Sequence, residues 1–506
     1  MEEGTPPCPC CLKVKPLDER IAETRAFLQH LEAHRAALMS GANTFQDLLT
    51  ALFPAEISSR ILSSCVDEEE VEMSVPLALS AVSKRWRAIA HTTPSLWTSI
   101  RVRSGFYGRQ DMYEEMLRDW LPRSAPQLLS ISLRIEDTDD DDALKSQYRP
   151  ILDVLNQHCN RWGKLSIEMP LRILGLFKTK FHDGPPLHSL SISPPDEYDD
   201  NDDVNQFGKF DLGATLPAPE IVLISCKVSR IHINWANVTS VSVSGPQVHE
   251  CVALFAAAPQ LRECKLTRVR DGANTTNVDP IVHQQLRNLT VQMSADSISP
   301  FFDNLAFPSL EFLKYHAFNQ PLTSLSSFLA CSSCPLKSLS IGENETADHR
   351  DELFEILWTL PSLEELERIG ASSFEDFFEL LASGEEYSHE RRFLPSLTKL
   401  FLDNTAGLQG FSWRDASMAV NARTSPYRSE HGHAFLKEFR WDMYVPEGED
   451  GYYIDEGSLQ VFERLIAGGV AINLSNGWQT DGKPEDMIVY SRAFYEAANS
   501  EPASNA

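Results

Sequence analysis

Cysteine is the residue type in this chain whose spacing comes nearest to a metal site. Cys8, Cys10 and Cys11 crowd the N-terminus, and Cys331 and Cys334 form a C-x-x-C pair. A structural zinc site needs four ligands, usually in two spaced pairs, and neither group has a second pair nearby. The spacing therefore favours ordinary thiols over zinc ligands.

Histidine and serine give no stronger chemical signal. His30 and His34 lie four residues apart, the spacing of one helical face, but no third metal ligand is evident. The chain contains no G-x-G-x-x-G, G-x-x-x-x-G-K-S/T, G-x-S-x-G or H-E-x-x-H motif. No spacing singles out a Ser-His-Asp triad. We therefore expect a protein that is not an enzyme, with no catalytic residues, no cofactor and no metal.

Acidic residues are concentrated in three short runs, at 67–72, 136–142 and 196–203. The 506 residues include 45 Lys and Arg against 72 Asp and Glu, a net charge of -27. None of the runs has the glycine that an EF-hand calcium loop needs at its sixth position. We interpret the runs as solvated loops. The net charge predicts no binding to nucleic acid or membranes and favours a basic protein partner.

Two further features bear on the compartment. The N-terminus has no basic stretch followed by an apolar run, and nowhere are there about 18 consecutive apolar residues. Ten cysteines in 506 residues are too few for a disulfide scaffold. We expect a soluble protein of the cytoplasm, the nucleus or both.

Residues 16–39 have the apolar spacing of a helix. Charged residues separate its main apolar positions, which are Ile21, Leu28, Leu31 and Leu38. Two to three heptads are too few for an independent coiled coil, so an amphipathic helix at 18–44, with a plausible stop at Ser40-Gly41, is expected to pack on the segment C-terminal to it. Residues 1–17 are expected to be flexible.

Two more helices are predicted between residues 45 and 103. Pro54 stands where a first helical turn needs no N–H, and Ile57 and Ile61 come after it on one face. A single second helix is predicted from apolar residues spaced 3, 4 and 3 apart: Leu79, Val82, Trp86 and Ile89. So small a unit has a marginal core until a partner covers its apolar surface, which indicates a docking module.

The order of these elements resembles the F-box, especially that of fungal F-box proteins. The resemblance rests on Phe-Pro-Ala-Glu-Ile at 53–57, Val-Ser-Lys-Arg-Trp at 82–86, and the ending at 89–97 that closes with Pro-Ser-Leu-Trp. A helix of the kind at 18–39 often precedes the box in those proteins. The chain departs from the family at Phe53, where leucine is usual, and in the acidic run between the helices.

The resemblance implies that residues 45–103 dock on Skp1 in a cullin-RING ubiquitin ligase. Motif match assigns six residues to the docking surface: Phe53, Pro54, Ile57, Ile61, Val82 and Trp86. For Ile57, Val82 and Trp86 the alternative is that they form the core of the module itself.

From residue 104 onward the chain repeats the pattern apolar-x-x-apolar-x-apolar. Each repeat predicts a three-residue strand whose inward side chains alternate, with helices between repeats, as at 297–304, 323–329, 351–360 and 374–381. The eleven copies begin at Leu128, Trp162, Leu187, Val238, Leu261, Leu286, Leu310, Leu336, Leu363, Leu397 and Leu436.

From Leu261 to Leu397 the copies are 25, 24, 26, 27 and 34 residues apart, the spacing of leucine-rich repeats. The fold class is therefore predicted as α/β: an all-α F-box with a preceding helix, then a leucine-rich-repeat-like solenoid at 104–475 and a partly disordered tail at 476–506. The expected repeat asparagine is clear only at Asn344, so its hydrogen-bond ladder should be irregular.

Insertions at 137–147, 196–215 and 403–433 are expected to be loops. The rival structure is an ordinary α/β enzyme sheet, whose strands would be longer than three residues and which would need a ligand site.

The function predicted from these features is that of a non-catalytic adaptor. Skp1 and cullin would bind at the F-box, and the repeat domain would bind a protein substrate of unknown identity. The alternative is an F-box-containing scaffold that acts outside a ubiquitin ligase.

Overall fold

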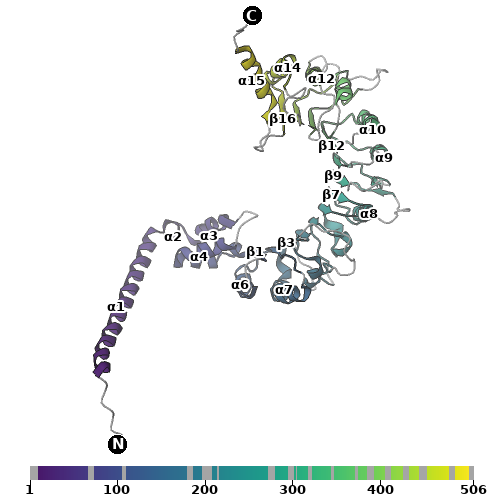
Figure 1. The fold of residues 1–506 in the computed structure, drawn as a ribbon. Coiled ribbons are helices and arrows are strands. Elements are labelled where there is room, and N and C mark those ends of the chain that lie inside the picture. Colours follow the sequence, from purple (N-terminus) through teal and green to yellow (C-terminus); the bar gives the residue numbers. More distant parts are fainter. Residues whose placement is uncertain are drawn as a thin grey trace. The chain divides into compact units, whose positions relative to one another are not determined.

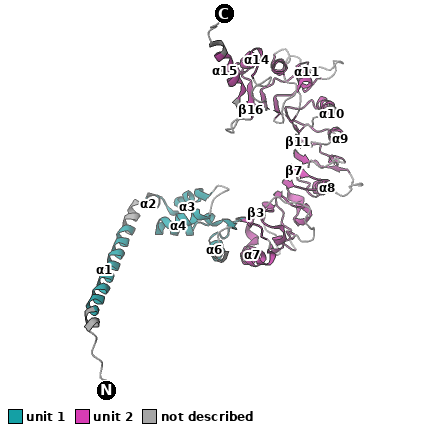
Figure 2. Cartoon of the chain, in the orientation of Figure 1, with its two compact units in different colours: residues 1–132 teal, residues 133–506 magenta. Residues whose placement is uncertain are grey.

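The computed structural model describes most of the chain. It divides into two compact units, residues 1–132 and 133–506, and mixes helices with a large parallel sheet (Figure 2). The described residues are 9–66, 73–104, 110–138, 140–178, 186–195, 208–213, 216–271, 280–293, 301–303, 305–316, 322–342, 347–370, 374–383, 392–404, 412–425, 432–443, 453–477 and 485–500.

Unit 1 is mainly helical (Figure 1). Its elements are α1 (Pro9–Gln46), α2 (Leu48–Leu52), α3 (Ala55–Ser63), the 3-10 helix η1 (Ser64–Val66), α4 (Ser74–Val82), α5 (Lys84–His91), the 3-10 helix η2 (Pro94–Trp97), β1 (Ser99–Arg103), α6 (Gln110–Arg123) and the first residues of β2 (Leu129–Arg134).

Helix α1 is longer than the sequence pattern predicts. It has 38 residues, starts within the stretch expected to be flexible, and continues past Ser40-Gly41. Its described side chains, at 14–39, are all exposed. The prediction that this helix packs on the segment C-terminal to it is therefore wrong, because no described part of the chain covers its apolar residues. Residues 1–8 lie outside the described part.

The single helix predicted through Val82 and Trp86 is in fact two helices. Ser83 interrupts it with an extended backbone, φ −155° and ψ 166°. The Ser83 hydroxyl accepts a hydrogen bond from the Trp86 N–H at 3.1 Å and so caps α5. Apolar spacing continues across the break, so periodicity alone could not show it. At the start of α3, Pro54 is the N-cap residue, and the helix itself begins at Ala55.

Trp97 lies at the centre of the unit 1 core and is fully buried. Its Nε1 donates to the Ala90 carbonyl at 2.8 Å, and its ring meets Trp120 edge-on with 4.6 Å between centroids. The Arg123 guanidinium lies 4.6 Å from the centroid of the Trp97 ring. The indole thereby fixes η2 against α5 and α6.

Unit 2 contains a sheet whose strand order follows the chain (Figure 1). Neighbouring strands from β3 to β16 are parallel, and only β17 is antiparallel. Its strands are β3 (Trp162–Glu168), β4 (Ser189–Ser193), β5 (Ile221–Ile224), β6 (Ser240–Ser244), β7 (Glu263–Val269), β9 (Asn288–Met293), β11 (Phe312–His316), β12 (Ser338–Gly342), β13 (Glu365–Ile369), β14 (Lys399–Asn404), β15 (Glu438–Met443), β16 (Ala471–Asn476) and β17 (Glu485–Asp486). The short strands β8 (Ile281–Val282) and β10 (Leu305–Ala306) pair with each other.

The strands are paired so that equivalent repeat positions lie side by side. One such buried row, from β9 to β14, consists of Leu289, Leu313, Leu339, Leu366 and Leu400. All eleven predicted repeats coincide with a strand, although these strands have five to seven residues instead of three. The inward pattern marks only the buried part of each strand, and backbone pairing extends beyond it.

Arg368 occupies a place in the next buried row where its neighbours in register are Ile341 and Leu402. It is completely buried. Its guanidinium carbon lies 5.9, 5.0 and 4.7 Å from the ring centroids of Phe354, Phe374 and Phe377. Cation–π attraction compensates part of the cost of burying the charge.

The helices of unit 2 lie between strands in the chain, except α15, which follows the last strand, β17. They are α7 (Asp141–Asn156), α8 (Val248–Ala257), α9 (Thr323–Ser332), α10 (Ala347–Trp358), α11 (Glu375–Ser383), α12 (Trp413–Arg423), α14 (Glu456–Ala467) and α15 (Met487–Ser500), with 3-10 turns η3 (Cys159–Arg161), η4 (Leu171–Leu176), η5 (Val228–Arg230) and η6 (Trp235–Asn237). The helices predicted at 323–329, 351–360 and 374–381 correspond to α9, α10 and α11.

Two predicted loops contain helices. The 137–147 insertion includes the start of α7, and the 403–433 insertion includes α12, which buries Trp413, Ala416 and Val420 at helical spacing. In the 196–215 insertion, Phe210 forms a β-bridge with Ile231, and residues 196–207 and 214–215 lie outside the described part. So do Asn344 and most of the helix predicted at 297–304, of which 301–303 form a turn.

The register predicts different costs for charge at two adjacent positions. Leu289→Asp should destabilise the protein by more than the about 2–5 kcal/mol typical of Leu→Ala, because it buries an unpaired carboxylate. Asn288→Asp, on the exposed face of the same strand, should change stability by about 0.5 kcal/mol or less. Thermal unfolding followed by circular dichroism measures both, and equal melting of the two variants would contradict the register.

Candidate docking surface

An apolar stripe runs along helix α3. Ile57 and Ile61 are four residues apart on one face of the helix, and the exposed Phe53, the extended C-cap of α2, precedes it. Ile57 and Ile61 are 40 % and 39 % exposed, whereas Ser58 and Leu62 on the other face are buried. Helix α3 therefore contributes to the core with one face and leaves two large apolar side chains in contact with solvent.

Two hydroxyl pairs fix the orientation of α3. The Oγ of Ser59 lies 2.6 Å from the Oγ1 of Thr93, and the Oγ of Ser63 lies 2.7 Å from the Oγ of Ser95. Both pairs join α3 to the segment that contains the buried Trp97. The apolar stripe thus faces outward because the opposite face is held by hydrogen bonds.

Helices α4 and α5 add to this surface. Val82, at the end of α4, is 54 % exposed, and Leu77 on the same helix is 47 % exposed. Trp86 on α5 is half-buried. Helix α5 packs against both α3 and α4, and the Arg87 Nε donates to the Ser80 carbonyl at 2.9 Å. The predicted residues therefore lie on three connected helices.

The exposure of Ile57 and Val82 argues against the alternative that they form the core of the module. Trp86 has an intermediate position and contributes to both core and surface. We call the exposed set the apolar docking surface: Leu52, Phe53, Pro54, Ile57, Ile61, Leu77 and Val82.

Leu52 and Leu77 were not among the predicted residues. Leu52 is the most exposed of the set, at 69 %, and directly precedes Phe53. Its position depends on Asp47, which caps the short helix α2 by accepting from the Thr50 N–H at 3.2 Å. Burial raises the pKa of Asp47, but hydrogen bonding, chiefly from the Thr50 side chain, and the Arg85 charge together outweigh that effect and lower the pKa. Leu52 could have been predicted because it directly precedes the Phe-Pro motif. No pattern in the sequence marks Leu77 as a surface residue.

The outer face of the unit 2 sheet, formed by side chains between the buried rows, is a second exposed surface. On β4 to β6 this face carries no charge. Ile221 and Leu223 of β5 are exposed there and lie between Ser189 and Ser191 of β4 and Ser240 and Ser242 of β6. On β11 to β13 it is polar, because Glu367 accepts from Ser340 and lies 3.3 Å from the Lys314 Nζ. Burial and the Lys314 charge lower the pKa of His316 beside this cluster.

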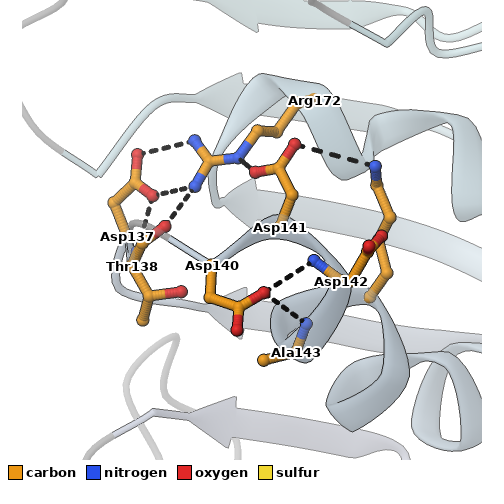
Figure 3. Close-up of polar contacts among 8 residues, drawn as sticks. Asp137, Thr138, Asp140, Asp141, Asp142, Ala143 and Arg172 are labelled. Carbon is orange, nitrogen blue, oxygen red and sulfur yellow. Dashed lines mark hydrogen bonds and ion pairs between the residues drawn. The ribbon is translucent and has the colours of Figure 1, made fainter.

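The described residues of the acidic run at 136–142 are largely exposed, as its composition predicts, but several of its carboxylates also make specific contacts (Figure 3). Asp140 caps α7 by accepting from the N–H groups of Asp142 and Ala143 at 3.1 and 3.0 Å. Arg172 pairs with both Asp137 and Asp141. One guanidinium and one helix N-terminus thus compensate the crowded carboxylates. The other two acidic runs, at 67–72 and 196–203, lie outside the described residues.

The described residues give no indication of metal or thiol chemistry. No group of three His, Cys, Asp or Glu side chains among them is placed to hold a metal ion. Burial raises the pKa of Cys226 to about 12 and also raises those of Cys251 and Cys264. These three thiols stay protonated and unreactive at neutral pH.

Among the other cysteines and histidines noted above, those with described side chains belong to no group that could hold a metal ion. Cys331 and Cys334 are free thiols, and His30 and His34 are exposed on α1. Cys8 lies outside the described part, as do the side chains of Cys10 and Cys11.

Comparisons with known proteins give no assignment. No protein-family model matches the chain, and no curated protein is significantly similar to it. Among the described helices, none combines the length and apolar character needed to cross a bilayer.

Replacing Arg172 should expose the repulsion within the acidic run. The hydrogen bonds from Arg172 lower the pKa of Asp137. The stabilisation from a lowered carboxyl pKa is complete above the unfolded value of about 3.9 and is lost as the pH falls through the folded value. Arg172→Gln should therefore cost about 1 kcal/mol at pH 7 and less at about pH 3, which lies below the unfolded pKa.

Urea denaturation at both pH values measures this difference. Arg118→Gln, which breaks an exposed pair with Glu114, is the control and should have a smaller effect at pH 7. A cost for Arg172→Gln that is the same at both pH values would show that its ion pairs are not responsible.

Proposed function

We propose that the chain is a non-catalytic substrate-recognition adaptor of a Skp1-cullin-F-box ubiquitin ligase. In this proposal residues 45–103 are an F-box that docks on Skp1, and residues 104–475 are a leucine-rich-repeat-like solenoid that binds the substrate protein. The observation that carries the proposal is the apolar docking surface, which includes five of the six residues assigned by motif.

The surface has the character of a docking site. Six large apolar side chains and one proline on short neighbouring helices are exposed to water. Contiguous apolar patches of this kind on small modules are typical of protein–protein interfaces. Burial of such side chains in a partner contributes about 25 cal/mol per Å² of apolar surface removed from water.

Strand order supports the solenoid part of the proposal. From β3 to β16 each strand pairs with the strands on either side of it in the sheet, without reversal of order. Nucleotide-binding α/β sheets instead reverse their strand order, and ligands bind where the reversal occurs. Strands of up to seven residues are longer than expected for leucine-rich repeats, but the register that aligns equivalent leucines is the one a repeat stack requires.

The outer sheet face is the surface proposed for the substrate. On β13 to β15 its acidic side chains outnumber its basic ones. The acidic residues are Glu365, Glu367, Asp403, Glu438 and Asp442, and the basic residues are Lys399 and Arg440. With the net charge of -27, this face favours a substrate segment rich in Lys and Arg, whose association it would accelerate.

Charge placed on the apolar stripe should abolish Skp1 binding without unfolding the module. We expect Ile57→Glu with Ile61→Glu to weaken binding by about 1,000-fold or more, because each buried anchor of an interface contributes about 2 kcal/mol or more. The two side chains are exposed in the free protein, so its circular dichroism should not change. Binding of purified Skp1 is measured by calorimetry.

Arg118→Glu on α6 is the matched control, since it is exposed and changes the charge by the same amount. Skp1 binding by the folded double variant at the wild-type affinity would refute the F-box assignment. Co-purification of Skp1 with cullin would support the ligase adaptor, whereas Skp1 without cullin would support the scaffold alternative.

A further inference from the structure

Helix α1 has an exposed face with the heptad spacing of a coiled coil. Its 38 residues extend about 57 Å at 1.5 Å per residue. The face consists of alternating a and d positions of the heptad, which are three or four residues apart. These residues are Val14, Leu17, Ile21, Thr24, Leu28, Leu31, Arg35 and Leu38. Six of these eight are apolar, and all eight are exposed. A face of this kind is stable in water only when another helix covers it.

From Ile21 to Leu38 the order of polar and apolar positions is symmetric about a point between Leu28 and Leu31. In an antiparallel pair each a position meets a d position of the other helix. If Leu28 meets Leu31 of a second copy, Ile21 meets Leu38 and the two polar positions, Thr24 and Arg35, meet each other. Apolar residues then meet only apolar residues in these layers, and the guanidinium has a hydroxyl beside it. The symmetry identifies a second α1 as the complementary surface.

Flanking charges also favour the antiparallel arrangement. In that register Arg25 of one helix lies beside Glu32 of the other, and symmetry gives this attractive pair twice. In a parallel pair, Arg35 would instead face Arg35 in the core, and Arg20 would approach Arg25 across the interface. The parallel arrangement therefore places Arg35 against Arg35 in the core, whereas the antiparallel arrangement places Arg35 against Thr24 and adds the two Arg25–Glu32 pairs.

We propose that the protein forms a homodimer through antiparallel pairing of α1 with α1 of a second copy. The interface is centred between Leu28 and Leu31. The proposal does not depend on the F-box assignment, because it rests on the exposed face and charges of α1 alone.

Sedimentation equilibrium of the full chain tests the dimer. The wild type should show a reversible monomer–dimer equilibrium, and Leu28→Asp with Leu31→Asp should be monomeric. The control is Ala26→Asp with Ala33→Asp, which adds the same charge to the same helix on its opposite side and should dimerise as the wild type does. A monomeric wild type, or equal loss of dimer in both variants, would overturn the proposal.

A charge exchange tests the orientation. Glu32→Arg should weaken an antiparallel dimer about tenfold, since both Arg25–Glu32 pairs become repulsive, and adding Arg25→Glu should restore it. In a parallel dimer residue 32 would lie beside Phe27 of the other helix, so the first change would leave association nearly unchanged. An unchanged dimer for Glu32→Arg, or failure of the second change to restore the dimer, would refute the antiparallel arrangement.

Discussion

The shared register of parallel strands is the constraint on which unit 2 depends. Each strand has a few inward side chains and cannot bury them alone, so Leu339 is covered because Leu313 and Leu366 lie beside it. Stability is then distributed over neighbouring repeats, and the outer face is free to vary. The same constraint explains why charged side chains such as Glu367 and Lys314 can face solvent on strands whose alternate residues are fully buried.

Leucine periodicity predicted eleven strands because apolar side chains mark the buried row directly. It missed β5 and β16, because the first position of the repeat pattern is not a large apolar side chain there: it is Pro219 before β5 and Gly469 before β16. It also did not foresee Arg368 in a buried row, since aromatic rings from α10, from α11 and from the residue before α11 surround that guanidinium. Composition predicted the exposure of the acidic run at 136–142 but not its contacts, because Arg172, which pairs with it, is distant in sequence.

The candidate docking surface was predictable only in part. Motif spacing identified Phe53, Ile57 and Ile61, yet whether such residues lie inside or outside a small module depends on what holds the opposite face. Here the Ser59 and Ser63 hydroxyls provide that contact, and neither serine has a distinctive local pattern. The helix break at Ser83 was also not predictable from the apolar spacing. The Ser83 hydroxyl caps a new helix there, while the apolar period continues across the break.

The antiparallel strand β17 has a consequence for how the sheet ends. A parallel sheet that grows in chain order leaves the backbone groups of its last strand unpaired, and such an edge can recruit strands from other molecules. After β16 the chain turns back, and Asp486 and Glu485 pair with Ser475 and Asn476. Two acidic residues thus occupy part of the growing edge, which stops further strand addition there and protects the protein against edge-to-edge aggregation.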